Sequence, residues 1–106
     1  MKEGSVFYIT AGSEEEANKV ATALVKNNLA ACVNVIPKIS SYFYWEGEVQ
    51  AEEEILMIGK TRSELVDELV EKVREVHSYE LPCVITWEID GGNQDFINWI
   101  IDETRG

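Results

Sequence analysis

The chain has 106 residues, 45% of them hydrophobic and 27% charged, which is typical of one globular domain and excludes a disordered or fibrous protein. Twenty acidic and nine basic residues give a net charge of -11, which repels phosphate backbones and anionic lipid surfaces. We therefore expect a single domain, residues 1–106, with neither nucleic acid nor a membrane among its partners.

The two cysteines, Cys32 and Cys83, bear on the cellular compartment. Two thiols in a chain of this size suit a reducing compartment better than a disulfide framework. The first residues show no long apolar core or small-residue cleavage site, and no apolar run reaches the roughly 18 to 20 residues that span a bilayer. The expected location is the cytoplasm.

The first strand and the first helix are predicted near the N-terminus. Residues 6–9 are β-branched or aromatic and lead to Ala11-Gly12, the pattern of a short buried strand that ends in a turn. Ser13 and Glu16 have the spacing of a capping box, which predicts a helix that begins there and ends at Asn27-Asn28. Apolar residues at helical spacing are predicted to face the core: Ala17, Val20, Ala21, Leu24 and Val25.

A long hairpin is predicted next. Residues 32–45 are strand-like, and Pro37 within them indicates a bulge or a solvent-facing edge because proline cannot donate to a β-ladder. Glu46-Gly47 is a turn signal, and the return strand is predicted over 48–59. The charge run Glu52-Glu53-Glu54 in its outer part is interpreted as a solvated face.

The second half continues the alternation of strand and helix. Thr61 and Glu64 have the spacing of a second capping box, which predicts a helix over 65–76. A strand over 83–89 and a helix over 94–103 follow. The resulting order predicts an α+β, ferredoxin-like βαββαβ fold with an extra C-terminal helix, in which the second and fourth strands are the sheet edges.

The hairpin is the first indication of an oligomer. At about 3.3 Å per residue, strand 32–45 would extend roughly 45 Å, whereas a globule of this size is only about 33 Å across. The overhang is aromatic on both faces through Tyr42, Phe43, Tyr44 and Trp45. Protruding apolar surface and two unpaired edges predict a cyclic homo-oligomer with these residues at the interface. The alternative is a monomer whose hairpin packs back over its own sheet.

Several short segments occur in an order that one known family shares. They are Ala30–Pro37, Ser41-Tyr42, Tyr44–Glu48, Lys60-Thr61, His77–Pro82 and Trp99. Through them, nearly the whole chain resembles the CutA divalent-ion tolerance family. The resemblance implies a homotrimer with a role in copper and other divalent-ion tolerance, and it implies no catalytic activity.

Two departures from the family pattern bear on copper. Some bacterial members carry a cysteine at the end of the first strand and a histidine pair before the tyrosine motif, and these have been put forward as copper ligands. The matching positions here are Ile9 and Val76, so only His77 of that set remains. Ser78 stands where the family usually has proline, which leaves the loop less rigid.

Four residues are candidate metal ligands: His77, Cys32, Cys83 and Glu80. Copper prefers thiolate ligands as Cu(I), and it prefers a combination of nitrogen and oxygen ligands as Cu(II). The two cysteines fall on opposite sheet edges in the predicted topology, so an ion would have to lie between Cys32 of one subunit and Cys83 or His77 of the next. The alternatives are a cap for His77 at the negative end of its helix and apolar packing for the buried thiols. We expect weakly bound copper or another divalent ion, and no organic cofactor.

A cleft between subunits is the second kind of site, with Lys60, Tyr79 and Trp45 as its candidate residues. Lys60 ends the predicted return strand and could meet an anion near a helix N-terminus, or it could form an ordinary surface ion pair. The sequence holds no Gly-rich phosphate loop, nucleophile elbow or Cys-x-x-Cys pair, so we expect no enzyme. A PII-like small-molecule sensor and a non-catalytic scaffold stay open as alternatives to ion tolerance, because a fold alone does not select a function.

Overall fold

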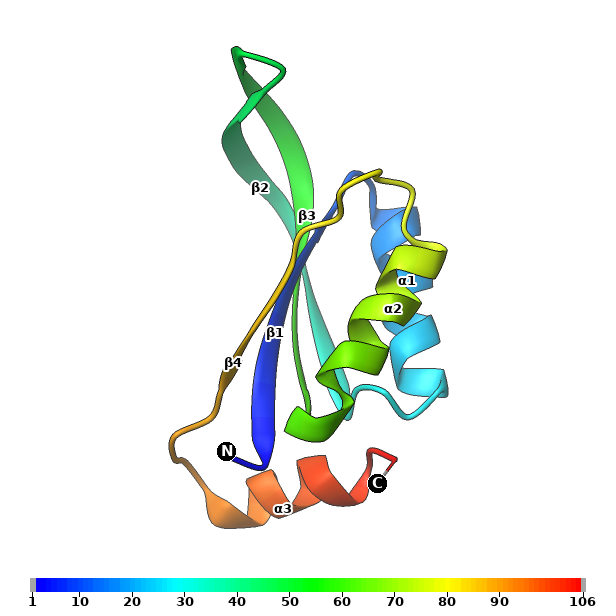
Figure 1. Cartoon of the computed structure of the whole chain (residues 1–106), viewed down its shortest axis with the longest axis vertical. Helices are drawn as coiled ribbons and strands as arrows, with labels where there is room; N and C mark the ends of the chain where they lie inside the picture. Colours follow the sequence, from blue (N-terminus) through cyan, green and yellow to red (C-terminus); the bar gives the residue numbers. More distant parts are fainter. Residues whose placement is uncertain (1, 106) are drawn as a thin grey trace.

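The computed structural model describes residues 2–105, and its elements follow the predicted order (Figure 1). They are β1 (Gly4–Ala11), α1 (Glu14–Lys26), β2 (Cys32–Trp45), β3 (Glu48–Arg62), the short 3-10 helix η1 (Ser63–Leu65), α2 (Val66–Val76), β4 (Val84–Glu88) and α3 (Gln94–Asp102). The strands form one antiparallel sheet in the order β2-β3-β1-β4, so β2 and β4 are its edges as predicted. Within residues 2–105, no helix has the length and hydrophobicity needed to cross a membrane.

The hydrophobic core lies between the sheet and the helices α1 and α2, which cover the same face (Figure 1). Successive strand residues point to opposite faces, so Phe7, Ile9 and Ala11 of β1 are buried together on this side. The opposite face of β1 carries Tyr8 and Thr10. This second face is the one that reaches the candidate site.

Helix α1 begins as predicted, but only half of the predicted capping box forms. The Ser13 hydroxyl accepts a hydrogen bond from the Glu16 backbone N–H at 3.1 Å, whereas the Glu16 carboxylate binds Ser78 across the molecule. The prediction that Val25 faces the core is wrong, since this side chain is 43% exposed. Successive residues of a helix are about 100° apart around its axis. Val25 therefore lies at the edge of the buried side of α1, which is centred near Leu24.

Ser13→Ala is expected to lower the free energy of unfolding by about 1 kcal/mol, because it removes the acceptor of the Glu16 N–H and little else. Urea unfolding of the variant beside the parent measures the difference. Ser13→Asp is the matched control and should keep most of the stability, since aspartate also caps a helix. An equal loss in both variants would contradict a capping role.

The second predicted capping box is wrong. Strand β3 continues past its predicted end at Gly59, because its pairing with β1 persists as far as Gly4↔Arg62. Thr61 is therefore a strand residue: it is fully buried, and its hydroxyl donates to the Leu29 carbonyl at 2.7 Å. The chain enters α2 through η1, and no side-chain hydrogen bond caps either of these two helices.

The β2-β3 hairpin projects well beyond the helices (Figure 1), and the chain measures 44 × 25 × 22 Å. The bulge predicted at Pro37 is present, since the pairing register shifts between Ile36 and Ile39. At the tip, Glu46 (φ 51) and Gly47 (φ 82) are both left-handed, as a two-residue type I′ turn requires. The predicted overhang is confirmed, and the hairpin does not pack back over its own sheet.

The sheet face opposite α1 and α2 is apolar and open. Cross-strand pairing places Tyr8 between Ile58 and Ile85 on this face. The most exposed apolar side chains of the face belong to the edge strands: Ile36 (40%), Phe43 (39%), Trp45 (42%), Ile85 (55%) and Trp87 (48%). A contiguous apolar surface that spans both edges indicates a contact surface.

Candidate functional site

A groove of about 700 Å³ runs between the projecting hairpin, β1 and the loop that joins α2 to β4. Its lining residues are Tyr8, Thr10, Ser41, Tyr42, Phe43, Tyr44, Trp45, Glu52, Glu54, Tyr79, Glu80, Leu81 and Cys83. This volume lies within the range of small-molecule sites. Segments that are far apart in the sequence meet here, so the groove exists only in the folded chain.

The groove brings together seven residues that the sequence singled out: Tyr42, Phe43, Tyr44, Trp45, Tyr79, Glu80 and Cys83. The other three predicted site residues, Cys32, Lys60 and His77, do not line it. Sequence reasoning missed the side chains that β1 and β3 contribute. A usable signal existed, because the register that pairs Ser41 with Glu52 puts alternate residues of β2 on the same face as Glu52 and Glu54.

Cys32 and Lys60 lie together at the other end of the hairpin, where they form a cross-strand pair. Lys60 does not end β3, because the strand continues to Arg62, so the expected place beside a helix N-terminus is wrong. Its ammonium group donates to Asn34 Oδ1 at 2.9 Å. Cys32 is in edge strand β2 whereas Cys83 precedes the opposite edge strand β4, so one chain keeps the two thiols apart as predicted.

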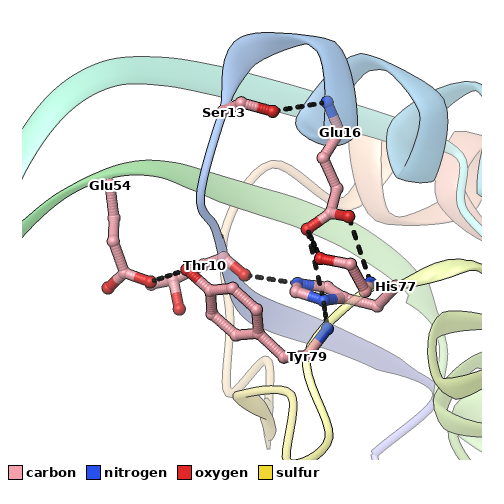
Figure 2. A network of polar contacts seen from close by, with 7 residues as sticks. Thr10, Ser13, Glu16, Glu54, His77 and Tyr79 are labelled. Atoms are coloured by element: carbon pink, nitrogen blue, oxygen red, sulfur yellow. Dashed lines mark hydrogen bonds and ion pairs between the residues drawn. The ribbon is translucent and has the colours of Figure 1, made fainter.

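Glu54 and Tyr79 connect the hairpin to the loop (Figure 2). The Tyr79 hydroxyl donates to Glu54 Oε2 at 2.8 Å. Glu54 is only 8% exposed, so the interpretation of the whole charge run as solvated is wrong at this position, where strand alternation turns the side chain under the loop. Burial and the hydrogen bond to Glu54 raise the pKa of Tyr79 well above its ordinary value, so the phenol stays protonated and remains the donor.

His77 holds the start of the same loop. Its side chain is buried, with Nε2 at 2.8 Å from the Thr10 carbonyl oxygen, and Nδ1 accepts from the Tyr79 backbone N–H at 3.1 Å (Figure 2). A carbonyl can only accept and a backbone N–H can only donate, so these contacts select the neutral Nε2–H tautomer. His77 thus makes the contacts of the alternative capping role. A metal ion could bind it only by displacing one of them.

Glu16 of α1 fastens the loop from a third direction. Its carboxylate accepts from the Ser78 backbone N–H at 3.0 Å and from the Ser78 hydroxyl at 2.9 Å. Glu16 Oε1 also lies 3.4 Å from Nδ1 of His77. The loop is therefore held by β1, β3 and α1 together, which positions Tyr79 against the groove.

Cys83 lines the groove beside Thr10. Burial raises the pKa of the Cys83 thiol, and the charge of Glu54 raises it further, while a hydrogen bond with the Thr10 side chain opposes the shift. The net effect favours the neutral thiol. A copper ion binds the thiolate, so it would have to displace this proton.

We expect Cys83 to be alkylated by iodoacetamide more slowly than an unshielded thiol, with a pH midpoint above that of the same thiol in the unfolded chain. The unfolded chain loses this proton at lower pH than the folded chain, so the thiol's contribution to stability is full below about pH 8.5 and falls as pH rises. Alkylation of a Cys32→Ala protein, which keeps Cys83 as its only thiol, measures the rate, and the same protein in urea is the control. Equal pH midpoints in both states would contradict the raised pKa.

The described residues contain no group of three His, Cys, Asp or Glu side chains close enough to hold a metal ion. Of the predicted ligands, Cys83 and Glu80 share the groove, whereas Cys32 lies on the opposite edge strand and His77 is occupied by other contacts. A metal site made of these residues stays a prediction that requires a second chain.

Comparison with known proteins gives a consistent result. Residues 5–103 match the family described as CutA1 divalent ion tolerance protein. The Archaeoglobus fulgidus protein named divalent-cation tolerance protein CutA is 48% identical over 97 residues, which are 92% of this chain and 93% of that protein. Protein CutA 1, chloroplastic, of Oryza sativa subsp. japonica is 42% identical over 94% of this chain, which spans only 56% of that longer protein. The solved structure of the periplasmic divalent cation tolerance protein CutA from Archaeoglobus fulgidus has a TM-score of 0.91 and 44% identity, and the match covers 94% of this chain and 97% of that one. This chain therefore belongs to the CutA family.

Proposed function

We propose that the protein contributes to divalent-cation tolerance as a non-catalytic homotrimer that binds copper or similar ions. The relatives are named for divalent-cation tolerance. The observation that carries the proposal is the anionic character of the groove, which combines Glu52, Glu54 and Glu80 with the thiol of Cys83. The net charge of -11 adds to the attraction of cations.

Three features support a closed ring of chains. The open sheet face is apolar, the hairpin projects beyond its own domain, and both sheet edges lack a partner strand within residues 2–105. Pairing β2 of one chain with β4 of the next would satisfy both edges and cover Ile85 and Trp87. The resemblance to CutA proteins implies that the ring has three members.

A second chain would also supply the missing metal ligands. Cys83 and Glu80 lie in the groove near the β4 edge, and Cys32 lies on the β2 edge that a neighbour would pair with. In the proposed ring, Cys32 of one subunit and Cys83 of the next would belong to the two edges that pair, and the site requires a register that brings them together. This arrangement combines a thiolate pair, which suits Cu(I), with a carboxylate.

Light scattering tests the assembly. We expect a mass of three times the 12.0 kDa of one chain. A mass of one chain would overturn the oligomer, and with it any site that needs a second subunit.

Calorimetric titration of the reduced protein with Cu(I) and with Cu(II) tests the ion. Cys83→Ser should weaken Cu(I) binding at least tenfold, and Glu80→Gln should weaken Cu(II) binding. Glu53→Gln is the matched control, because Glu53 is exposed and does not line the groove. Binding that is the same in all three variants would overturn the metal site.

A small-molecule sensor is the second candidate function, and the aromatic lining of the groove favours it.

The location is proposed to be the cytoplasm, since the free thiols of Cys32 and Cys83 suit a reducing compartment. Relatives carry other locations in their names, periplasmic for one and chloroplastic for another. Fractionation of the native organism decides between these compartments.

A further inference from the structure

We propose that the exposed face of α3 docks an arginine-bearing segment of a partner protein, with the rings of Phe96 and Trp99 under the guanidinium groups and acidic side chains beside them. This inference goes beyond the metal proposal, because it concerns a protein ligand and uses no residue of the groove. It gives a partner class to the non-catalytic scaffold, which stayed open as an alternative function.

Helix α3 turns only one side to the rest of the chain. Ile100 is 1% exposed, and Ile97 and Ile101 are half-buried, so these three residues mark the packed side. Phe96 (45%) and Trp99 (40%) are exposed instead, and their ring centroids lie 5.2 Å apart. Two adjoining exposed rings form a contiguous apolar patch, which is typical of a contact surface.

Carboxylates share this face with the rings. Asp95, Trp99 and Asp102 follow one another at intervals of four and three residues, so they lie on one side of the helix, and all three are exposed. Helix α3 itself contains no lysine or arginine. Arg62 and Arg105, which lie near its end, form ion pairs with glutamates of η1 and α2. The face therefore attracts positive charge and repels phosphate groups.

An arginine side chain matches both parts of this face. Its planar guanidinium stacks on an aromatic ring and pairs with a carboxylate through a fixed fork of N–H groups, whereas lysine carries a compact, strongly hydrated charge. Asp95 and Asp102 are about 10 Å apart along the axis, at roughly 1.5 Å per residue, with Trp99 between them. Alternate residues of an extended chain are about 7 Å apart on one side. Two such arginines can therefore reach both carboxylates across the ring.

The face also stays open in the proposed ring of chains. Helix α3 lies across the end of the sheet, at the opposite end of the molecule from the hairpin tip (Figure 1). It packs against β1 and β3, so its other side points away from the sheet. A ring that closes through the edges β2 and β4 places neighbouring chains beside the sheet, whereas α3 lies at its end.

Three short peptides test the ligand class. They alternate glycine with arginine, with lysine or with citrulline, and both ends are blocked; lysine keeps the charge, and citrulline keeps nearly the shape of arginine without its charge. Calorimetry and NMR of the tryptophan indole N–H groups, on the full chain in its native oligomer at about 0.15 M salt, measure the affinities. We expect saturable binding of the arginine peptide, about threefold or more tighter than the lysine peptide and about tenfold tighter than the citrulline peptide. The indole signal of Trp99 should shift.

Four variants separate the charge from the rings. Asp102→Asn should weaken binding of the arginine peptide about threefold. Glu14→Gln is the matched control, because it removes the same charge at an exposed position of α1 that lies far from α3, and it should leave the affinity unchanged (Figure 1). Trp99→Leu and Phe96→Leu should each reduce the preference for arginine over lysine. Because part of Trp99 is buried, the Phe96 variant repeats the test at the more exposed ring.

Equal affinity for the arginine and lysine peptides would overturn the proposal, since it would show diffuse attraction alone. Equal losses in Asp102→Asn and Glu14→Gln, or no binding up to about 10 mM, would also overturn it. Light scattering on Trp99→Leu tests the remaining occupant: we expect the mass of the parent, and a lower mass would assign this face to a neighbouring chain and exclude the partner site. None of these results depends on copper, so this proposal and the metal proposal can fail separately.

Discussion

Replacing Gly59 by alanine is expected to lower the free energy of unfolding by about 3 kcal/mol or more. The added Cβ would lie 2.6 Å from Cε2 of Phe7 and 2.7 Å from the carbonyl oxygen of Cys32. Phe7 faces Gly59 in the β1-β3 pair and is 0% exposed, so its ring has no free space to enter, and the Cys32 oxygen belongs to the backbone. Urea unfolding at a fixed chain concentration measures the loss.

Two further variants show whether the cause is steric. Gly91→Ala is the matched control, because no atom lies within 4 Å of its added Cβ, and it should change stability by less than about 0.5 kcal/mol. In a Phe7→Leu background, Gly59→Ala should cost less than in the parent, since the ring atoms are gone, but some cost should persist from the Cys32 oxygen. A Gly59→Ala protein as stable as the parent would contradict this close packing.

His77→Leu is expected to lower the free energy of unfolding by about 2–4 kcal/mol. Leucine fills much of the volume but leaves the Thr10 carbonyl and the Tyr79 backbone N–H without their partner, and a buried unpaired group costs about 1–3 kcal/mol. The loop should also loosen, because this N–H fixes Tyr79 next to Glu54. Urea unfolding reports the stability, and hydrogen exchange at the Tyr79 amide reports the loop.

Two polar variants of His77 separate its two hydrogen bonds. Glutamine can donate to the Thr10 carbonyl, and asparagine can accept from the N–H two residues ahead, so each should retain part of the stability that leucine loses. Ser78→Ala is the neighbouring control at an exposed position and should cost less than about 1 kcal/mol. Equal stability of the leucine and parent proteins would show that the imidazole contacts contribute nothing.

The candidate site was only partly predictable from the sequence. The hairpin aromatics, Tyr79, Glu80 and Cys83 were all singled out, because protruding aromatics and a rare thiol can be recognised along the chain. Glu54, the buried residue of the glutamate run, was not singled out. Glu52, Glu53 and Glu54 have the same chemistry, and only the loop that lies over Glu54 makes it different.

The sequence by itself determined the order of the elements, the edge strands, the Pro37 bulge, the hairpin turn and the overhang. Each of these depends on residues close together in the chain, through side-chain periodicity, turn conformation or strand length. Only the tertiary structure decided that Thr61 stays in β3, that Glu16 binds the distant loop, and that His77 is neutral and enclosed. Those outcomes depend on partners such as Thr10, which is 67 residues from His77. Burial and polar pairing depend on residues that are distant in the sequence but close in the fold, so no local sequence pattern predicts them.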